Sequence, residues 1–190
     1  FIASANAIAY CGASPWLLDV TVDSWTLDPV LLGEQLATET NQRNDRLIHK
    51  ATGRRVAAVM PVYTLGMPAN MDAIVKIAND YNLPVIADGA AALGATYKGR
   101  LSGNLGADLT VYSFNGNKIV TAGGGGAVVG KNPELMELVR HLTTTAKVEE
   151  TYHHDRVGFN YRMTNIAAAV GCAQMELLEK FVGVKRKIQK

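Results

Sequence analysis

The sequence predicts an α/β protein with three layers, in which helices flank a mostly parallel sheet. Three observations support this fold class. Short apolar runs alternate along the chain with segments of helical periodicity. The runs at 56–63 and 83–88 read as strands buried on both faces, as is typical of a parallel sheet. Hydrophobic residues make up 48% of the 190 positions, which is enough for a substantial core. Such alternation favours a layered sheet.

The individual elements follow from these patterns and from their end signals. Asp28 and Asn132 each precede a proline, which is the arrangement of a capping residue followed by the first helical position. Thr164 is placed to cap the last helical segment. The expected strands are residues 15–20, 56–63, 83–88, 107–114 and 126–130; the expected helices are 28–40, 70–82, 132–142 and one long helix from 165 to 190, with 41–55 as a polar surface connection.

Composition excludes several classes of function. A net charge of +2 gives no reason to expect binding to nucleic acid or to a membrane surface, and no apolar run approaches the length of a membrane span. Cys11 and Cys172 lie in apolar helical contexts, so we expect free buried thiols in a reducing cytosol. The adjacent His153 and His154 have no further ligands at useful spacing, so we expect no metal site.

Two polar side chains end expected strands. Asp88 closes the apolar run "LPVIAD", and Ser113 lies near the end of "LTVYSF". Functional groups of α/β sheets gather at the carboxyl ends of the strands, so this edge is the expected site. Asp88 could instead be a cap or half of an ion pair, and Ser113 an ordinary turn residue. The small residues of "GAAALGATYKG" leave room for a flat ligand or serve close packing.

Lys118 lies in "SFNGNKIVTAGGGG", between two expected strands. A phosphate-binding GxxxxGK[ST] loop has its glycines before the lysine and a hydroxyl residue after it. Here Ile119 follows Lys118 and the glycines come later, which excludes that loop. The glycines at 123–126 also lead into a strand, which argues against a Rossmann dinucleotide loop. A lone lysine is most often a solvated charge, but this one has glycines that clear space beside it.

Amine, carboxylate and hydroxyl are together the parts of a pyridoxal phosphate site. A lysine forms a Schiff base with the cofactor aldehyde, a carboxylate pairs with the pyridine nitrogen, and hydroxyls bind the phosphate. Lys118, Asp88 and Ser113 match these roles in that order. The carboxylate matters because a protonated pyridine is a stronger electron sink than a neutral one.

The sequence also resembles a known family, the sugar-nucleotide aminotransferases of the DegT/StrS type, which adopt the aspartate-aminotransferase-like fold. The resemblance runs over essentially all 190 residues. It rests on the motifs "FIASANAI", "MPVYTLGMPANMDAI", "VIADGAAALGATYKG", "SFNGNK" with its glycine run, and "VGFNYRM".

The resemblance implies roles for five residues. Lys118 matches the Schiff-base lysine, Asp88 the partner of the pyridine nitrogen, and Ser113 a phosphate-binding serine. Asn160 matches an asparagine that reaches the phosphate bound in the neighbouring subunit of a homodimer, and Phe1 an aromatic residue that stacks on the cofactor ring. A plain turn residue is the alternative for Asn160.

Two positions depart from the family pattern. Ala91 stands where a Gln or His commonly contacts the cofactor, and the run "GGGG" lacks a glutamate often found within it. In the related sugar dehydratases a histidine replaces the lysine, so Lys118 favours transamination.

The resemblance implies an enzyme that transfers an amino group, usually from glutamate, to a keto-sugar nucleotide. A 4-keto-6-deoxy sugar for surface polysaccharide is the expected substrate. The alternatives are a sugar dehydratase or another pyridoxal phosphate enzyme of this fold, and a non-catalytic regulatory protein. We expect residues 1–165 to be the core of the large domain without its N-terminal part, and residues 166–190 a helix leading to a small domain absent from this chain.

Overall fold

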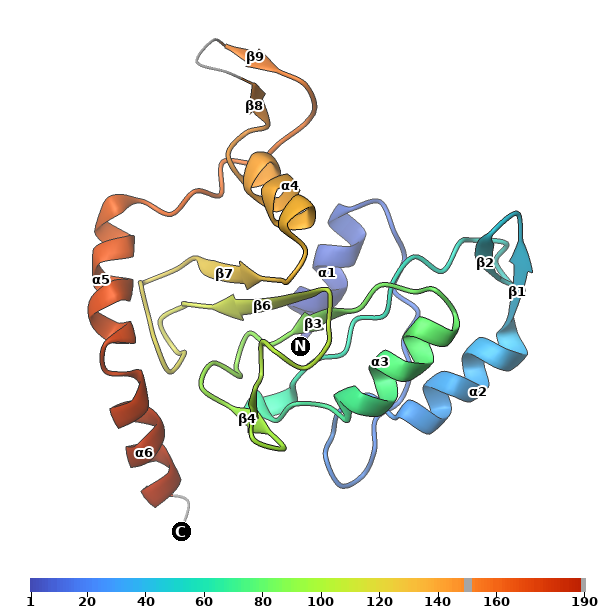
Figure 1. Ribbon diagram of the computed structural model, residues 1–190, viewed down its shortest axis with the longest axis horizontal. Coiled ribbons are helices and arrows are strands. Elements are labelled where there is room, and N and C mark those ends of the chain that lie inside the picture. The colour runs from blue at the N-terminus through green and yellow to red at the C-terminus, as the bar shows by residue number, and fades with distance from the viewer. Residues whose placement is uncertain (149–151, 189–190) are drawn as a thin grey trace.

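The computed structural model describes residues 1–148 and 152–188 (Figure 1). Its helices are α1 (Ile2–Tyr10), α2 (Pro29–Glu39), α3 (Met71–Asp80), α4 (Pro133–Thr143), α5 (Asn165–Met175) and α6 (Leu178–Ile188), with a 3-10 turn at Thr64–Gly66. Its strands are β1 (Thr40–Arg43), β2 (Arg46–His49), β3 (Ile86–Asp88), β4 (Thr96–Tyr97), β5 (Arg100–Leu101), β6 (Leu109–Ser113), β7 (Gly126–Val129), β8 (Lys147–Val148) and β9 (His153–His154).

The central sheet has the order β3-β6-β7. The β3 and β6 strands run parallel with Asp88 opposite Val111, whereas β6 and β7 are antiparallel. An extended segment joins the other side of β3 through parallel bridges at Val59 and Val62. The expected strand at 56–63 therefore pairs only at single positions. Pro61 explains this, because proline has no N–H to donate to the ladder.

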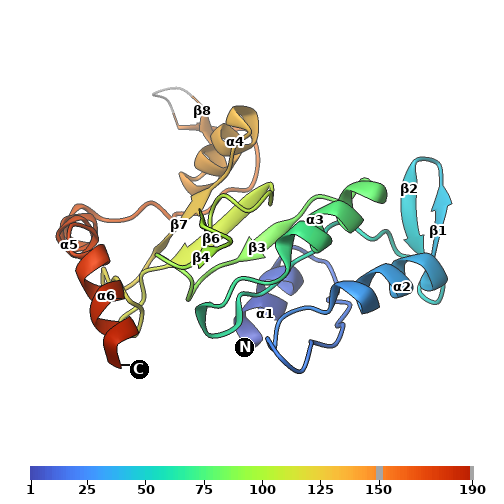
Figure 2. The ribbon, with the colours of Figure 1, turned by 60° about the horizontal axis from the view of Figure 1, so that its bottom comes forward.

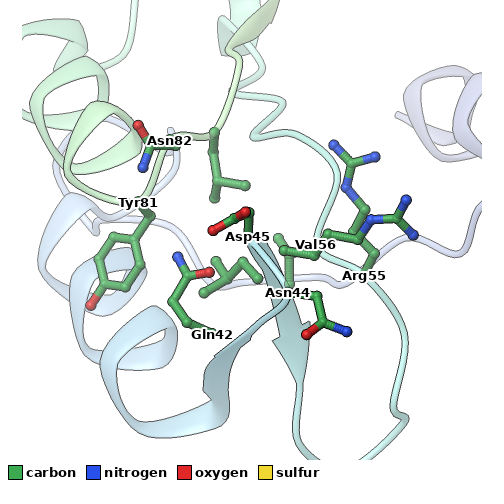
Figure 3. Close-up of a pocket in the computed structure, with 10 residues that line it drawn as sticks. Gln42, Asn44, Asp45, Arg55, Val56, Tyr81 and Asn82 are labelled. Atoms are coloured by element: carbon green, nitrogen blue, oxygen red, sulfur yellow. The ribbon is translucent and has the colours of Figure 1, made fainter.

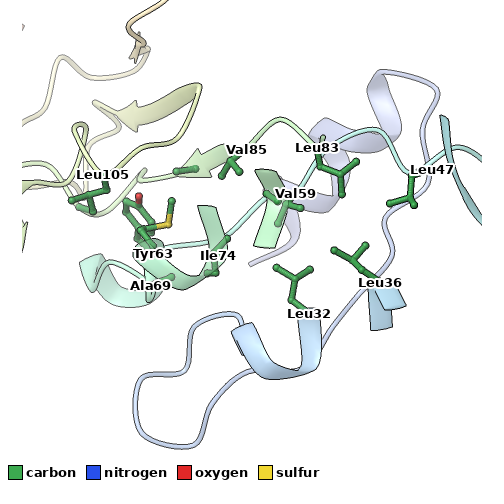
Figure 4. Packing of buried hydrophobic residues seen from close by; sticks show 14 residues of the cluster. Leu32, Leu36, Leu47, Val59, Tyr63, Ala69, Ile74, Leu83, Val85 and Leu105 are labelled. Carbon is green, nitrogen blue, oxygen red and sulfur yellow. The ribbon is translucent and has the colours of Figure 1, made fainter. Parts of the chain in front are cut away.

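The two faces of β3 have different neighbours. Val85 and Ala87 belong to the buried core cluster that also contains Ile74 of α3. Figure 4 shows Val85 and Ile74 in this cluster. Because side chains alternate along a strand, Asp88 points to the opposite face. Ser4 of α1 contacts Asp88 on that face. The strands thus lie between α3 and α1, which is the layered arrangement expected from the sequence.

The helix-capping signals are confirmed. Asp28 Oδ1 accepts hydrogen bonds from the backbone N–H groups of Val30 and Leu31 at the start of α2. Asn132 and Thr164 cap α4 and α5: Asn132 Oδ1 accepts from the N–H of Leu135, and Thr164 Oγ1 accepts from the N–H of Ala167. These side chains satisfy N–H groups that have no partner within the helix.

The C-terminal helix expected from 165 to 190 is two helices. Leu177 N–H donates to the Gln174 carbonyl at 3.1 Å, a tight i to i−3 turn that separates α5 from α6. In Figure 2 α5 is seen end-on and α6 from the side, so the axis changes direction. The change lets α6 pack on Gly94, whose ideal Cβ would lie 2.8 Å from Val182. Residues 189 and 190 lie outside the described residues.

One further expectation for the chain's elements was wrong, and another was incomplete. Residues 15–20 form no strand beyond a bridge from Val20 to Leu27, and the 80% exposure of Leu17 shows that this run is not covered on both faces. The 41–55 connection contains the β1–β2 hairpin. Its turn residues Asn44 and Asp45 have φ of 49° and 58°, values typical of a two-residue hairpin turn.

Cys11 and Cys172 are both free, as expected, but both are exposed rather than buried. Among the described residues, no helix combines the length and apolar character needed to cross a membrane.

Candidate functional site

Asp88 and Ser113 lie at the same edge and on the same face of the sheet. Both end parallel strands, β3 and β6. Asp88 is opposite Val111, and Ser113 is two residues beyond Val111, so all three side chains point to the face that carries α1. Lys118 follows in the loop that leaves this edge. The parallel topology therefore gathers the carboxylate, the hydroxyl and the lysine loop at the carboxyl ends of the strands.

The Asp88 carboxylate is held at both oxygens. Ser4 Oγ donates to Oδ2 at 2.5 Å, and the backbone N–H of Ala90 donates to Oδ1 at 3.1 Å. The strand itself is fixed by Asp88 N–H to the Pro61 carbonyl and by Tyr63 N–H to the Asp88 carbonyl, both at 2.9 Å. The half-buried Asp88 side chain is therefore held in one orientation by the hydrogen bonds from Ser4 and Ala90.

The Lys118 loop is closed at its base by Phe114. The Phe114 carbonyl accepts from Ala122 N–H at 2.9 Å, and Phe114 N–H donates to the Gly125 carbonyl at 3.0 Å. Within the loop, Lys118 N–H donates to the Asn115 carbonyl at 3.0 Å. Fully buried Val120 anchors the loop to the body. A half-buried lysine on an anchored loop is in a defined position relative to the strand end.

The glycines around Lys118 do different things. An ideal Cβ built on Gly116, Gly123 or Gly124 would have no atom within 4 Å, so open space surrounds them. A Cβ on Gly126 would lie 2.2 Å from the Tyr112 carbonyl oxygen, so no side chain fits where β7 meets β6. The residues present suit pyridoxal phosphate, because an amine, a carboxylate and a hydroxyl border open space at one edge.

The small residues after Asp88 serve packing at two positions. A Cβ on Gly89 would lie 3.1 Å from both Thr110 Cγ2 and the Val111 carbonyl oxygen, and Gly94 contacts α6. The close-packing interpretation therefore holds at both. Ala91 is exposed, and its carbonyl oxygen would lie 2.6 Å from a Cβ on Gly66, so the backbone of the 64–66 turn packs closely behind it.

Phe1 and Asn160 lie outside this group. Phe1 is fully exposed and is the N-cap residue of α1, three residues before Ser4. Asn160 is exposed, and its backbone forms an isolated bridge with Thr144, next to the end of α4. Among the described residues, no hydrogen bond joins Asn160 to Asp88, Ser113 or Lys118. Within this chain, then, the structure brings three of the five expected residues to one edge, and Phe1 and Asn160 are not among them.

Two residues of interest were missed by the sequence analysis. Ser4 contacts Asp88 across 84 positions, a pairing that no local pattern indicates. Tyr63 has an exposure of only 1%, and its backbone N–H donates to the Asp88 carbonyl. Burial, and secondarily the nearby Tyr112, raises the pKa of Tyr63 far above its ordinary value. For Tyr63, the only signal available in the sequence was a tyrosine inside an apolar run.

A hollow of about 370 Å³ lies elsewhere on the molecule (Figure 3). It is bordered by the β1–β2 hairpin, by Arg55 and by Tyr81 to Leu83. Leu83 precedes β3, so this hollow is near the amino ends of the strands, away from Asp88. Within 1–148 and 152–188, no group of three or more metal-ligand side chains occurs. The chemistry at the carboxyl edge makes that edge the stronger candidate.

Comparisons with known proteins agree with this arrangement. Residues 1–190 match the family model of the DegT/DnrJ/EryC1/StrS aminotransferase family. GDP-perosamine synthase of Caulobacter vibrioides is 40% identical over 189 residues, which are 99% of this chain and 46% of that protein. The dTDP-3-amino-3,4,6-trideoxy-alpha-D-glucose transaminase of Streptomyces venezuelae is 34% identical over 184 residues, 96% of this chain and 44% of that protein.

Solved structures give the same result. The structure of 3-amino-5-hydroxybenzoic acid synthase matches with a TM-score of 0.83 and 30% identity, over 98% of this chain and 45% of that one. DesV of Streptomyces venezuelae matches with a TM-score of 0.79 and 32% identity, over 95% and 44%. The chain spans about half the length of these relatives. The neighbours confirm the expected aspartate-aminotransferase-like fold of pyridoxal phosphate enzymes. The chain belongs to the DegT/DnrJ/EryC1/StrS aminotransferase family.

Proposed function

We propose that the full-length protein is a pyridoxal phosphate-dependent aminotransferase that transfers an amino group to a keto-sugar nucleotide. The observation that carries the proposal is the meeting of Asp88, Ser113 and the Lys118 loop at one edge of the sheet, beside glycines with open space. The family and the relatives, which include a transaminase of a dTDP-sugar, support it.

Five residues would hold the cofactor. The Lys118 amine would bind its aldehyde carbon, the Asp88 carboxylate would accept a hydrogen bond from its ring nitrogen, and the Ser113 hydroxyl would donate to its phosphate. Phe1 would pack on the ring face. Asn160 would reach the phosphate of a second subunit. When bound, pyridoxal phosphate supplies an electron sink for the electron pair left on a substrate carbon.

The proton transfers fall to Lys118. Once its amine is free, it would take a proton from the substrate carbon and return it to the neighbouring carbon, acting as base and then acid. Asp88 would keep the ring nitrogen protonated by remaining its hydrogen-bond acceptor. The anchored loop would hold the Lys118 amine on one side of the site, so that the same group serves both transfers.

For the finer substrate assignment we propose glutamate as the amino donor and a 4-keto-6-deoxy sugar nucleotide as the acceptor, used for surface polysaccharide. The "GNK" sequence around Lys118 resembles enzymes of that type. The relatives carry different nucleotides in their names, GDP in one and dTDP in another. The acceptor panel in an assay should therefore include both.

We further propose a homodimer with shared active sites. The exposed position of Asn160, without a contact to the Asp88 group in this chain, supports a role in a partner's site. The exposed apolar side chains of α5, among them Ile166 and Val170, are available for contact with other parts of the protein.

The decisive experiment concerns Lys118. We expect full-length protein with added pyridoxal phosphate to show a visible absorption band that borohydride fixes covalently to the protein. Lys118→Ala should lose the fixed label and at least about a hundredfold of transaminase activity, because the amine carries both the attachment and the proton transfer. Lys131→Ala, a change of an exposed lysine after β7, should keep both.

Two outcomes would contradict the proposal. Wild-type protein without a lysine-bound chromophore would favour a non-catalytic protein of this fold. A chromophore on Lys118 combined with loss of water from the sugar, and no net amine transfer, would favour a dehydratase.

A further inference from the structure

We propose that Ser4 is a positioning residue of the cofactor site, which fixes the orientation of the Asp88 carboxylate and docks α1 beside it. This inference rests on the proposed function. Its starting observation is the hydrogen bond from Ser4 Oγ to Asp88 Oδ2 at 2.5 Å, in a partly buried setting. Serine hydroxyls bonded to an ionised acceptor form the shorter and stronger class of hydrogen bonds.

The bond completes the restraint on the carboxylate. Ala90 N–H holds Oδ1 and Ser4 holds Oδ2, so the carboxylate plane cannot turn without losing one donor. An ionised carboxylate is an acceptor with about four lone-pair sites. Two donors leave sites free for a further N–H. With Ser4 in place, the free lone pairs of the Asp88 carboxylate point in a fixed direction. Without Ser4, the carboxylate can rotate about its Cβ–Cγ bond.

The same bond makes up much of what fixes α1. No residue of α1 is buried, and Phe1 at its N-cap makes no side-chain capping bond. Its half-buried residues are Ser4, Ala5 and Ile8, which lie on one helical face. Since this face buries little apolar area, the hydrogen bond contributes a large share of the docking free energy.

Phe1 depends on this docking. It lies three residues before Ser4, and residues three apart share a helical face. A docked Ser4 therefore brings the side of α1 that carries Phe1 toward Asp88. Ser4 would thus affect two contacts with the cofactor, that of Asp88 with the ring nitrogen and that of Phe1 with the ring face. Ser4 itself would not touch the cofactor.

The first test uses full-length, cofactor-free protein and hydrogen exchange in the peptide that covers α1. Ser4→Ala should speed exchange about tenfold, because a hydrogen bond to a charged group is lost. Alanine is the better helix former, so faster exchange would report lost docking and not lost helix propensity. Ser4→Thr keeps a hydroxyl and should restore protection, and Asn6→Ala, on the exposed side of α1, should leave it unchanged. Unaltered exchange in Ser4→Ala would overturn the inference.

The second test measures binding of pyridoxal phosphate by absorbance. Ser4→Ala should weaken the Kd about tenfold in protein with Asp88 and have no effect in an Asp88→Ala background, since Ser4 acts through Asp88. Equal effects in both backgrounds would overturn the positioning role. If wild-type protein does not bind the cofactor, the proposed function fails, and with it the role of Ser4 toward the cofactor. Failure of Ser4 alone would leave wild-type binding intact.

Discussion

At the scale of single residues, the hydroxyl groups of Tyr112 and Tyr63 differ in their hydrogen bonds. Tyr112 Oη and Ser102 Oγ are 2.8 Å apart, and Ser102 Oγ also donates to the Ala92 carbonyl at 2.7 Å. Tyr63 Oη is buried and has no hydrogen-bond partner among the described residues. Of these two neighbouring tyrosines, Tyr112 therefore has a hydrogen-bonded hydroxyl, and Tyr63 has one that is unbonded within the described part of the chain.

This contrast gives a matched pair of substitutions. Tyr112→Phe should lower stability by about 1 kcal/mol, because Ser102 loses a partner. Tyr63→Phe should leave the melting temperature unchanged or raise it, because it removes a buried polar group that costs desolvation and gains no bond. Thermal unfolding of both variants checks this. A melting temperature lowered as much by Tyr63→Phe as by Tyr112→Phe would show that Tyr63 has a partner.

At the scale of elements, capping residues and prolines predicted the helix ends, because these ends depend on interactions between residues close in sequence. Helices with a capping side chain and a proline were predicted at nearly their observed ends, as for α2 and α4. The strands of the central sheet were predicted in place but too long, since their ends depend on partners, and Pro61 interrupts the ladder beside β3. The strand expected at 15–20 does not form. The α5–α6 break has no proline or capping signal, so the local sequence did not predict it; α6 beyond the break packs closely on Gly94.

The candidate site divides in the same way. Asp88, Ser113 and Lys118 were located from the sequence because strand ends are readable and parallel strands place their ends together. Ser4 was not, because its contact is long-range. The roles of all these residues, and of Phe1 and Asn160, stay predictions until they are tested.

The first turn of α3 carries a charge cluster with a pH dependence. Hydrogen bonds from Lys98, and then from Arg100, lower the pKa of the Asp72 carboxyl. A carboxyl whose pKa is lower in the folded protein adds stability above its unfolded pKa, about 4, and that stability is lost as the pH falls through the folded value. The negative charge also lies near the helix N-terminus, which adds to the effect.

We therefore expect Asp72→Asn to lower the melting temperature slightly at pH 6, with a difference that shrinks as the pH falls toward 2. The effect should be small because the charges are exposed, and 0.5 M salt should reduce it. Melting curves of both proteins from pH 2 to 6 measure it. A constant or widening difference at acid pH would contradict the assigned ion pairs. Lys76→Ala, a change in the separate pair with Asp80, serves as the control.

At the scale of the whole molecule, the question is which parts complete the site. The chain spans about half of its relatives, and α1 and α5 expose most of their apolar residues. Asn160 lies apart from the Asp88 group. If the sites are shared between subunits, two proteins that are each defective should complement one another.

Subunit mixing tests this. Lys118→Ala and Asn160→Ala dimers should each be impaired. After unfolding and refolding together, half of the dimers are mixed, and each mixed dimer contains one site with both residues intact. Activity should then recover to about a quarter of the wild-type value. Activity equal to the mean of the two parents would show that Asn160 acts within its own subunit, or not at all.

The long reach between Ser4 and Asp88 also bears on how the protein is made. The central strands come from one contiguous part of the chain, from Val59 to Val129, so they can assemble among themselves as soon as that part has been synthesised. The α1 segment leaves the ribosome earlier, but Ser4 cannot bond to Asp88 until β3 has been made, 84 residues later. For this contact, the order of assembly is the reverse of the order of synthesis.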